Sequence, residues 1–133
     1  EKAIRGARMA FLKGGKALAL GISTACLYPM AMEDSLQTLI DSGFREFEIF
    51  INTYSEMEPE FLTMLEEKLK PQGCRVKSLH PFTSGFESYL LFSNYERRFQ
   101  DGASFYRRYF EMARRLGAKI LVIHGDRSFE KAA

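Results

Sequence analysis

The sequence predicts an α/β fold with a parallel sheet that curves as part of a barrel. Two observations lead to this fold class. A unit in which a helical pattern ends at a glycine and a strand pattern follows occurs three times, and one side of the second strand is polar. Strands joined by helical crossovers run parallel, and helices cover parallel sheets.

The repeated unit places the strands. "GFREFEIF", "GCRVKSLH" and "GAKILVIH" each begin with a glycine, followed by one residue, a basic residue and an apolar run. A further apolar run, "ALALGISTACL", precedes the first unit. The expected order is therefore strand, helix, strand, helix, strand, helix, strand. We expect the strands near residues 18–27, 45–51, 74–80 and 118–124.

A helical pattern lies before each glycine. "MEDSLQTLIDSG" carries an apolar stripe, "EPEFLTMLEEKLKPQG" has Pro59 at a position suited to the first helical turn, and "DGASFYRRYFEMARRLG" starts at Asp101, which we expect to cap the helix. Gly43, Gly73 and Gly117 then suit the left-handed position that ends a helix. The residues expected on the buried faces are Leu36, Leu39, Ile40, Phe61, Leu62, Leu65, Leu69, Phe105, Tyr109, Met112 and Leu116.

The second strand favours a barrel over a doubly wound sheet. Side chains alternate along a strand, so Phe47, Ile49 and Ile51 share the side that faces the helices. Glu46, Glu48 and Asn52 then point to the other side. A doubly wound sheet is covered on both faces and would be apolar there, whereas a barrel lumen accepts polar groups.

His80 and His124, the two histidines of the chain, stand at the downstream ends of the third and fourth strands. Ligands of parallel α/β folds bind at this end. Imidazole there can bind a divalent metal, transfer a proton or hold a sugar hydroxyl, or it can simply cap the strand through a backbone hydrogen bond. Glu48 is a possible third ligand, and Asn52 and Asp126 are further candidates for the pocket.

The segment between the third strand and the next helix, residues 81–100, is long and rich in aromatic residues. Loops of this length are usually functional. We expect a short helical insert over the strand ends, with Phe82 and Phe86 near the ligand. The alternative is that these aromatic side chains pack beneath the rim of the sheet.

Charge and hydropathy narrow the class of protein. The net charge is +2, but residues 1–16 hold five basic residues and one acidic residue, a balance of +4. The remainder carries 14 basic and 16 acidic residues, a balance of −2, which argues against nucleic acid as a partner. Residues 1–17 are expected to form a basic, helical extension.

No apolar run reaches the roughly 18 residues of a membrane helix, so no membrane partner and a cytoplasmic location are expected.

With these pieces placed, "LGISTACL", "FEIFINT", "SLHPFTSGFE" and "LGAKILVIHGD" resemble the strand ends of the xylose isomerase-like TIM barrels. This superfamily includes sugar phosphate isomerases and epimerases together with endonuclease IV-type enzymes. The resemblance runs from about Leu18 to Arg127. It implies a sugar or sugar-phosphate substrate and a divalent metal (Mn, Mg, Co or Zn) at the carboxyl ends of the strands.

The resemblance also implies roles for the two histidines. In endonuclease IV-like members the histidines that end the third and fourth strands bind zinc, and they match His80 and His124. In the isomerase and epimerase members the essential ligands are two glutamates, an aspartate and a histidine on strands five to eight. Those strands would lie beyond this sequence, since a complete barrel takes about 250 residues.

We therefore expect residues 18–133 to form the first four strands of a TIM barrel, a half-barrel of an isomerase or epimerase. Such a half is expected to be inactive alone and to pair with a second copy or with the other half of the barrel, because its edge strands carry unpaired backbone groups. Two alternatives stay open: an endonuclease IV-like zinc phosphodiesterase acting on abasic DNA, and a half-barrel scaffold without chemistry.

Overall fold

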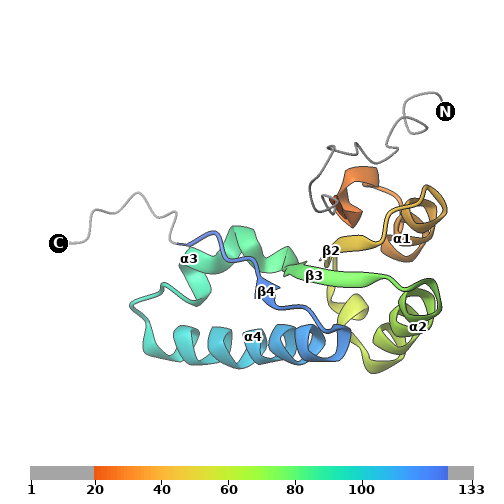
Figure 1. Cartoon of the computed structure of the whole chain (residues 1–133). Helices are drawn as coiled ribbons and strands as arrows, with labels where there is room; N and C mark the ends of the chain where they lie inside the picture. The colour runs from red at the N-terminus through yellow and green to blue at the C-terminus, as the bar shows by residue number, and fades with distance from the viewer. Residues whose placement is uncertain (1–19, 126–133) are drawn as a thin grey trace, which may run out of the picture.

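The computed structural model describes residues 20–125 and shows an α/β fold with one parallel sheet (Figure 1). The four strands are β1 (Gly21–Ser23), β2 (Glu46–Phe50), β3 (Arg75–His80) and β4 (Ile120–Leu121). They lie in the order β1-β2-β3-β4, and each neighbouring pair is parallel. The predicted α/β class with a parallel sheet is confirmed.

Helices connect the strands. The long ones are α1 (Met32–Asp41), α2 (Pro59–Leu69) and α4 (Glu96–Leu116), and α3 (Glu87–Leu90) is a single turn. In Figure 1, α1 and α2 lie to the right of the sheet and α4 lies below it. Short 3-10 helices occupy the connections: η1 (Thr24–Leu27), η2 (Tyr54–Met57), η3 (Lys70–Gln72) and η4 (Phe82–Phe86).

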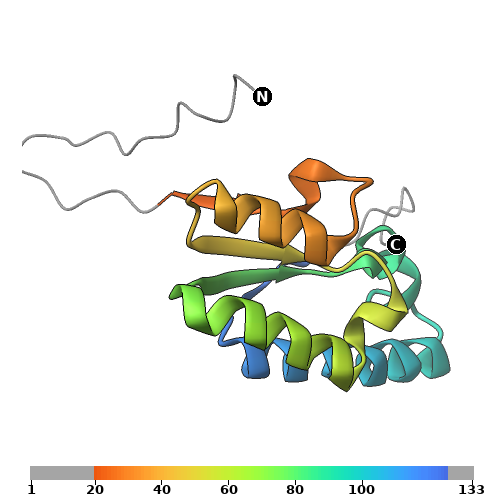
Figure 2. The same ribbon diagram turned by 90° about the vertical axis from the view of Figure 1, so that its right-hand side faces the viewer.

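The core lies between the sheet and these helices. As predicted, Phe47, Ile49 and Ile51 of β2 are fully buried on the helix side. Figure 2 shows α2 and α4 side by side beneath β3. The helices contribute most of the predicted apolar stripes, but Phe61, Phe105 and Leu116 are only partly buried. Met32 and Tyr106 are buried although the pattern did not predict them. The buried helix residues are Met32, Leu36, Leu39, Ile40, Leu62, Leu65, Leu69, Tyr106, Tyr109 and Met112.

The opposite face of the sheet is polar near the start of the strands. Glu46 is almost buried, and its carboxylate pairs with the guanidinium of Arg75 and, at 2.9 Å, with Nζ of Lys77. An irregularity in the β2–β3 ladder places Glu46 opposite Arg75 but Glu48 opposite Ser78. Lys77 is the extra residue, and such a bulge lets Arg75, Lys77 and Ser78 all serve the same face.

The first predicted strand is shorter than expected. β1 ends at Ser23, and the apolar residues that follow form η1 instead of extending the strand. Ser23 accepts a hydrogen bond from the backbone N–H of Ala25, and Thr24 Oγ1 accepts one from Phe50 N. Ser35 Oγ in turn donates to Thr24 O at 2.7 Å. One local bond, at Ser23, and two bonds from distant parts of the chain, at Thr24, thus accompany the turn of the backbone out of the ladder.

The fourth predicted strand is also shorter, since only Ile120 and Leu121 pair with β3 as strand residues. The backbone continues alongside β3 for one more bond, from Val122 N to Leu79 O at 2.9 Å. His124 therefore lies beyond the end of β4, three residues after Leu121, and not within it.

The third long helix begins earlier than predicted. α4 starts at Glu96, so Asp101 lies exposed within the helix and does not cap it. Gly102 follows it inside the helix, where glycine normally lowers stability. Here the glycine has a packing role, because an added Cβ would lie 3.0 Å from Cβ of Leu90. The close contact of α4 with α3 depends on that missing side chain.

The helix boundaries marked by proline and glycine are confirmed. Pro59 is the first residue of α2. Gly43, Gly73 and Gly117 all have positive φ, of 96°, 64° and 73°, after the helical segments that they follow. These positions favour glycine, which carries no Cβ to clash in the left-handed conformation.

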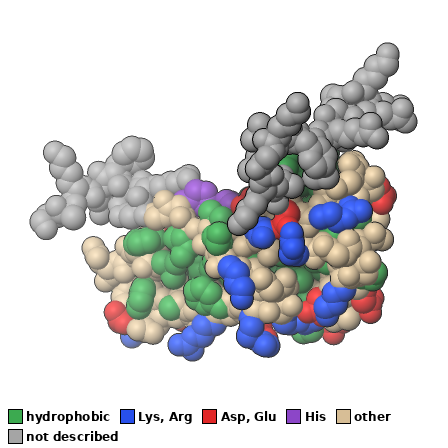
Figure 3. Space-filling model, viewed as in Figure 1, with side chains coloured by type: hydrophobic (Ala, Val, Ile, Leu, Met, Phe, Trp, Pro, Cys, Tyr) green, Lys and Arg blue, Asp and Glu red, His purple; other side chains and the backbone are tan. Residues whose placement is uncertain are grey.

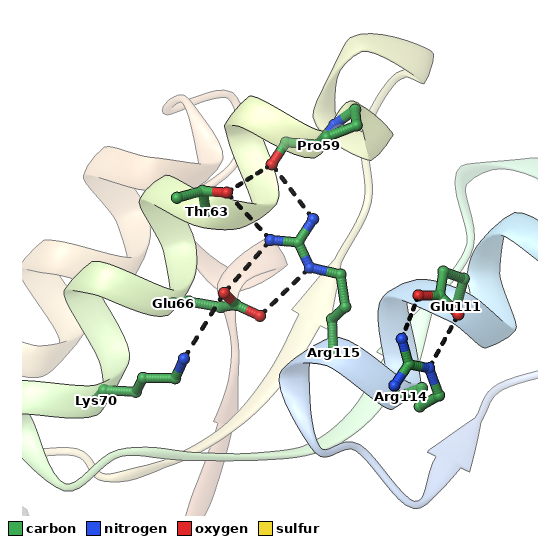
Figure 4. A network of polar contacts seen from close by, with 7 residues as sticks. All are labelled: Pro59, Thr63, Glu66, Lys70, Glu111, Arg114 and Arg115. Carbon is green, nitrogen blue, oxygen red and sulfur yellow. Dashed lines mark hydrogen bonds and ion pairs between the residues drawn. The ribbon is translucent and has the colours of Figure 1, made fainter.

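An ion network joins α4 to α2 (Figure 4). The guanidinium of Arg115 contacts both carboxylate oxygens of Glu66, at 3.3 and 3.4 Å, and also reaches Thr63 Oγ1 and the carbonyl oxygen of Pro59. Lys70 lies 3.7 Å from the same carboxylate. This network fixes the two helices against each other on the outside of the fold.

Two expectations lie outside the described residues. These are the helical extension at 1–17 and the position of Asp126. Between residues 20 and 125, no helix combines the length and the apolar character needed to cross a membrane.

Candidate functional site

The two histidines meet at the carboxyl ends of β3 and β4. His80 is the last residue of β3, and the ring centroids of His80 and His124 are 4.8 Å apart, with an angle of 72° between the planes. The strand-end argument places both residues at this edge, and the structure brings their side chains into contact. In Figure 3 the histidine side chains reach the upper surface of the molecule.

Phe50 supports His80 from the neighbouring strand. The two residues are partners in the β2–β3 register, and their rings stack at 4.5 Å with an interplanar angle of 19°. His80 is half-buried, and its Nδ1 atom is buried without a hydrogen-bond partner among residues 20–125. A backbone hydrogen bond at Pro81 nevertheless acts on the His80 imidazole, so the alternative in which His80 caps the strand stays open.

The surroundings of His80 lower its pKa. Burial is the largest cause, because it disfavours the charged imidazolium, and the neighbouring His124 acts in the same direction. The negative charges of Glu48 and Glu87 oppose this by raising the pKa. The net lowering favours the neutral imidazole at neutral pH, which is the form that binds metals and accepts protons.

Glu48 lies on the same face of the sheet as His80. It pairs with Ser78 in the β2–β3 register, and Ser78 Oγ donates a hydrogen bond of 3.1 Å to Glu48 Oε2. Since His80 is two residues after Ser78, alternation puts both on this face. Glu48 is half-buried, and among residues 20–125 the bond from Ser78 is the hydrogen bond that its carboxylate accepts.

Asn52 is held within the loop after β2. Its backbone N–H donates to Glu56 Oε2 at 2.6 Å, and its side-chain amide donates to the same carboxylate and to the carbonyl oxygen of Phe50. Glu56 is 8% exposed. The Asn52 donors thus stabilise the loop, and a role for Asn52 in a pocket stays a prediction, as does that of Asp126.

Glu87 is a member of the site that the sequence analysis missed. It is 1% exposed, and its Oε2 accepts hydrogen bonds from the backbone N–H groups of His124 and Gly125, at 2.6 and 3.0 Å. Its Oε1 accepts a third bond, from the hydroxyl of Tyr106 at 3.1 Å. The spacing of the sequence gave no signal for Glu87, because its carboxylate binds residues that lie 37 and 38 positions further along the chain.

The Glu87 contacts continue into the core through hydroxyl groups. Thr83 Oγ1 shares hydrogen bonds with the hydroxyls of Tyr106, at 3.2 Å, and Tyr109, at 3.3 Å. Burial raises the pKa of Tyr106 to about 12 and also raises that of Tyr109. Both phenols therefore stay protonated at neutral pH, so Tyr106 is a permanent donor to the carboxylate.

Residues 81–100, the aromatic segment after β3, agree in part with each alternative, the helical insert near a ligand and the packing beneath the sheet. Short helices η4 and α3 do form there. Phe82 packs against Phe105 and Tyr109, with centroid distances of 6.2 and 6.4 Å, as the packing alternative predicts. Phe86 is 62% exposed. Its place near a ligand stays a prediction.

A complete metal site is not formed by the described residues alone. Within residues 20–125, no group of three His, Cys, Asp or Glu side chains is arranged to hold a metal ion. His80 and His124 supply two nitrogen ligands at most, and Glu48 does not complete the set in this arrangement. The donor pair itself, with a buried Nδ1 atom that lacks a partner, fits a partial ligand set.

Comparison with known proteins gives no relative: no family model matches the chain, and neither a curated protein nor a solved structure is similar to it.

Proposed function

We propose that this chain forms the front half of a (β/α)₈ barrel belonging to a divalent-metal-dependent sugar or sugar-phosphate isomerase or epimerase. The contact between His80 and His124 carries the proposal. Two imidazoles in contact at the carboxyl ends of adjacent parallel strands stand where this architecture binds its ligands. The sequential order β1-β2-β3-β4 of four parallel strands connected by helices supports the same fold.

In this proposal the residues of the chain bind and orient the substrate. His80 and His124 contribute to the metal or sugar pocket, and Glu48 offers its carboxylate on the same face of the sheet as His80. Asn52 and Asp126 are further candidates for the pocket. A bound divalent ion (Mn, Mg, Co or Zn) would supply electrostatic stabilisation of the substrate oxygens. The carboxylates that move the proton would come from the other half of the barrel.

Metal titration by calorimetry tests the pocket. We expect the complete 133-residue chain to bind Zn²⁺ or Co²⁺ weakly, because two protein ligands hold a metal less tightly than three or four. His80→Ala and His124→Ala should each reduce the affinity at least tenfold. Glu60→Gln, which removes an exposed carboxylate on α2, is the matched control and should leave the affinity unchanged. Equal binding by all four proteins would contradict the pocket.

The substrate class is tested on the complete barrel. A protein in which this chain is joined or mixed with its second half should interconvert sugar or sugar-phosphate isomers in a metal-dependent reaction. Nicking of abasic DNA by that assembly would favour the endonuclease IV-like alternative instead, which uses the same two histidines. Metal binding without either activity would favour a scaffold.

We also propose that the chain associates with a second copy. β4 pairs with β3 along one edge, and Ile120 and Ile123 are 58% and 46% exposed there. In Figure 3 hydrophobic side chains gather over the region of α4 and β4. Two copies could close edge to edge about a two-fold axis.

Light scattering at micromolar concentration should show a dimer that Ile120→Lys weakens, and a monodisperse 15.3 kDa monomer would contradict it. A cytoplasmic location belongs to the same proposal.

A further inference from the structure

Glu87 is a buried acidic residue, and its burial lowers the stability of the fold unless other contacts compensate. Moving a carboxylate out of water is unfavourable by several kcal/mol unless hydrogen bonds replace the lost hydration. At 1% exposure Glu87 lies in that situation, and it sits on α3, a single helical turn. The contacts of the Glu87 carboxylate must therefore compensate for its burial.

The carboxylate binds two consecutive backbone N–H groups. His124 N and Gly125 N both point at Oε2, at 2.6 and 3.0 Å. Successive amides that converge in this way form a nest, the backbone arrangement that proteins use to bind anions. Gly125 has φ of +79°, the left-handed conformation that glycine adopts readily. Glu87 thus occupies the nest as an internal anion.

The position of His124 depends on this contact, because the ladder has already ended. The Val122 N to Leu79 O bond is two residues upstream. Beyond it, the amide of His124 donates to Glu87 and not to a strand. The other carboxylate oxygen is held by Tyr106, which is fixed in α4. A line of contacts therefore runs from the core through Glu87 to the backbone that carries the second imidazole.

We propose that Glu87 is the positioning residue of the histidine pair, holding the His124–Gly125 backbone so that the His124 imidazole lies against His80. The purpose of this positioning rests on the proposed function, whereas the positioning itself is a property of the chain and is tested without any ligand.

Three variants separate the contact from general stability. Glu87→Ala removes both oxygens. Glu87→Gln keeps one oxygen for the two amides and turns its NH₂ group towards the Tyr106 hydroxyl, which can accept. Tyr106→Phe is the matched control, because it removes a hydrogen bond of similar length to the same carboxylate but leaves Oε2 on the nest.

NMR of the metal-free chain gives the readout. With only two histidines in the sequence, the cross-peak between their imidazole rings is easily assigned. Glu87→Ala should abolish this cross-peak, move the His124 and Gly125 amide protons upfield, and speed their exchange with solvent at least tenfold. Glu87→Gln and Tyr106→Phe should keep the cross-peak. A Glu87→Ala protein with an intact cross-peak and unchanged exchange overturns the proposal.

Gly125→Val provides a second route if Glu87→Ala does not fold. A valine Cβ meets no atom of residues 20–125 within 4 Å, so the substitution acts through the unfavourable φ and turns the amides away from Glu87. The imidazole cross-peak should again disappear, and its persistence would count against positioning.

Zn²⁺ titration of the same variants links this inference to the proposed function. Glu87→Ala should weaken Zn²⁺ binding at least tenfold, while Glu87→Gln and Tyr106→Phe stay within about threefold of the parent. If the parent chain binds no Zn²⁺ at all, the metal pocket is lost, and the NMR result still decides whether Glu87 positions His124.

Discussion

Helix α4 makes polar contacts on two sides that differ in their surroundings. Towards the core, the hydroxyls of Tyr106 and Tyr109 meet Thr83, and Tyr106 also meets Glu87, all of them buried. Towards α2, the Arg115 side chain is 24% exposed where it meets Glu66 (Figure 4). Charged groups near water interact weakly, whereas a buried polar network must be complete because every missing bond leaves a desolvated group.

The two networks also differ in what they reach. The buried contacts lead through Glu87 to the backbone of His124, whereas the Arg115 contacts join two helices and go no further. Substitutions that displace Glu87 from the His124 backbone should therefore disturb both stability and the histidine pair. Substitutions on the α2 side should affect stability alone.

The largest effect is expected at Gly102, where the core side of α4 touches α3. Gly102→Val would drive its side chain into Leu90, since a Cβ alone comes within 3.0 Å of one side-chain atom and 3.2 Å of the Leu90 backbone. Overpacking of this kind costs about 1–3 kcal/mol. Urea unfolding followed by circular dichroism should show the loss, and α3 should shift together with Glu87. An unchanged free energy of unfolding would mean that α3 and α4 can move apart without loss, and it would contradict the importance of their close contact.

Thr83→Val removes one hydroxyl from the buried network at nearly constant volume. The hydroxyls of Tyr106 and Tyr109 each lose a partner, and unsatisfied buried groups cost about 1–3 kcal/mol. Denaturant unfolding should therefore report a lower free energy of unfolding. Phe105→Leu, a change in α4 that involves no side-chain hydrogen bond, is a control for altered packing.

Arg115→Ala tests the α2 side and should cost about 0.5–1 kcal/mol, because the ion pair with Glu66 is partly exposed. Salt should reduce the difference from the parent. Arg114→Ala is the matched control: its side chain is 73% exposed and contacts Glu111 within the same helix. That variant should lie within about 0.5 kcal/mol of the parent. A larger loss at Arg114 than at Arg115 would contradict the importance of the link between helices.

A smaller, pH-dependent effect should separate the two networks further. Hydrogen bonding to the Arg115 guanidinium lowers the pKa of Glu66 below its ordinary 4.5. A lowered carboxyl pKa adds stability that is fully present above 4.5 and is lost as the pH falls through the lower value. The stability difference between parent and Arg115→Ala should shrink over that range. The loss in Thr83→Val, which changes no charge, should stay constant there.

The sequence predicted those parts of the fold that local signals determine. Pro59 at the start of α2 and glycines after the helices act within a few residues, so their positions could be read directly. The alternation in β2 likewise identified the buried side of the strand, Phe47, Ile49 and Ile51. The half-barrel itself, the metal and the substrate stay predictions.

Features that depend on distant contacts were not predictable in this way. β1 ends early because Thr24 bonds to Phe50 and Ser35 across the fold. Aspartate is a residue type that often caps helices, so Asp101 was expected to start the helix. Instead α4 begins at Glu96, and Gly102 lets it pack closely against α3. At the site, strand ends identified His80 and His124, but the burial of Glu87 is a tertiary property with no periodicity behind it.

The shortness of β4 has a consequence for motion. Only Ile120 and Leu121 join the ladder, with one further backbone bond at Val122. Releasing such a segment exposes little apolar surface, so it requires far less free energy than global unfolding. Breaking the hold of Glu87 on two amides would let residues 122–125 leave the sheet edge while β1, β2 and β3 stay folded. Whether the two imidazoles are together is thus a local equilibrium, separate from the folding of the domain.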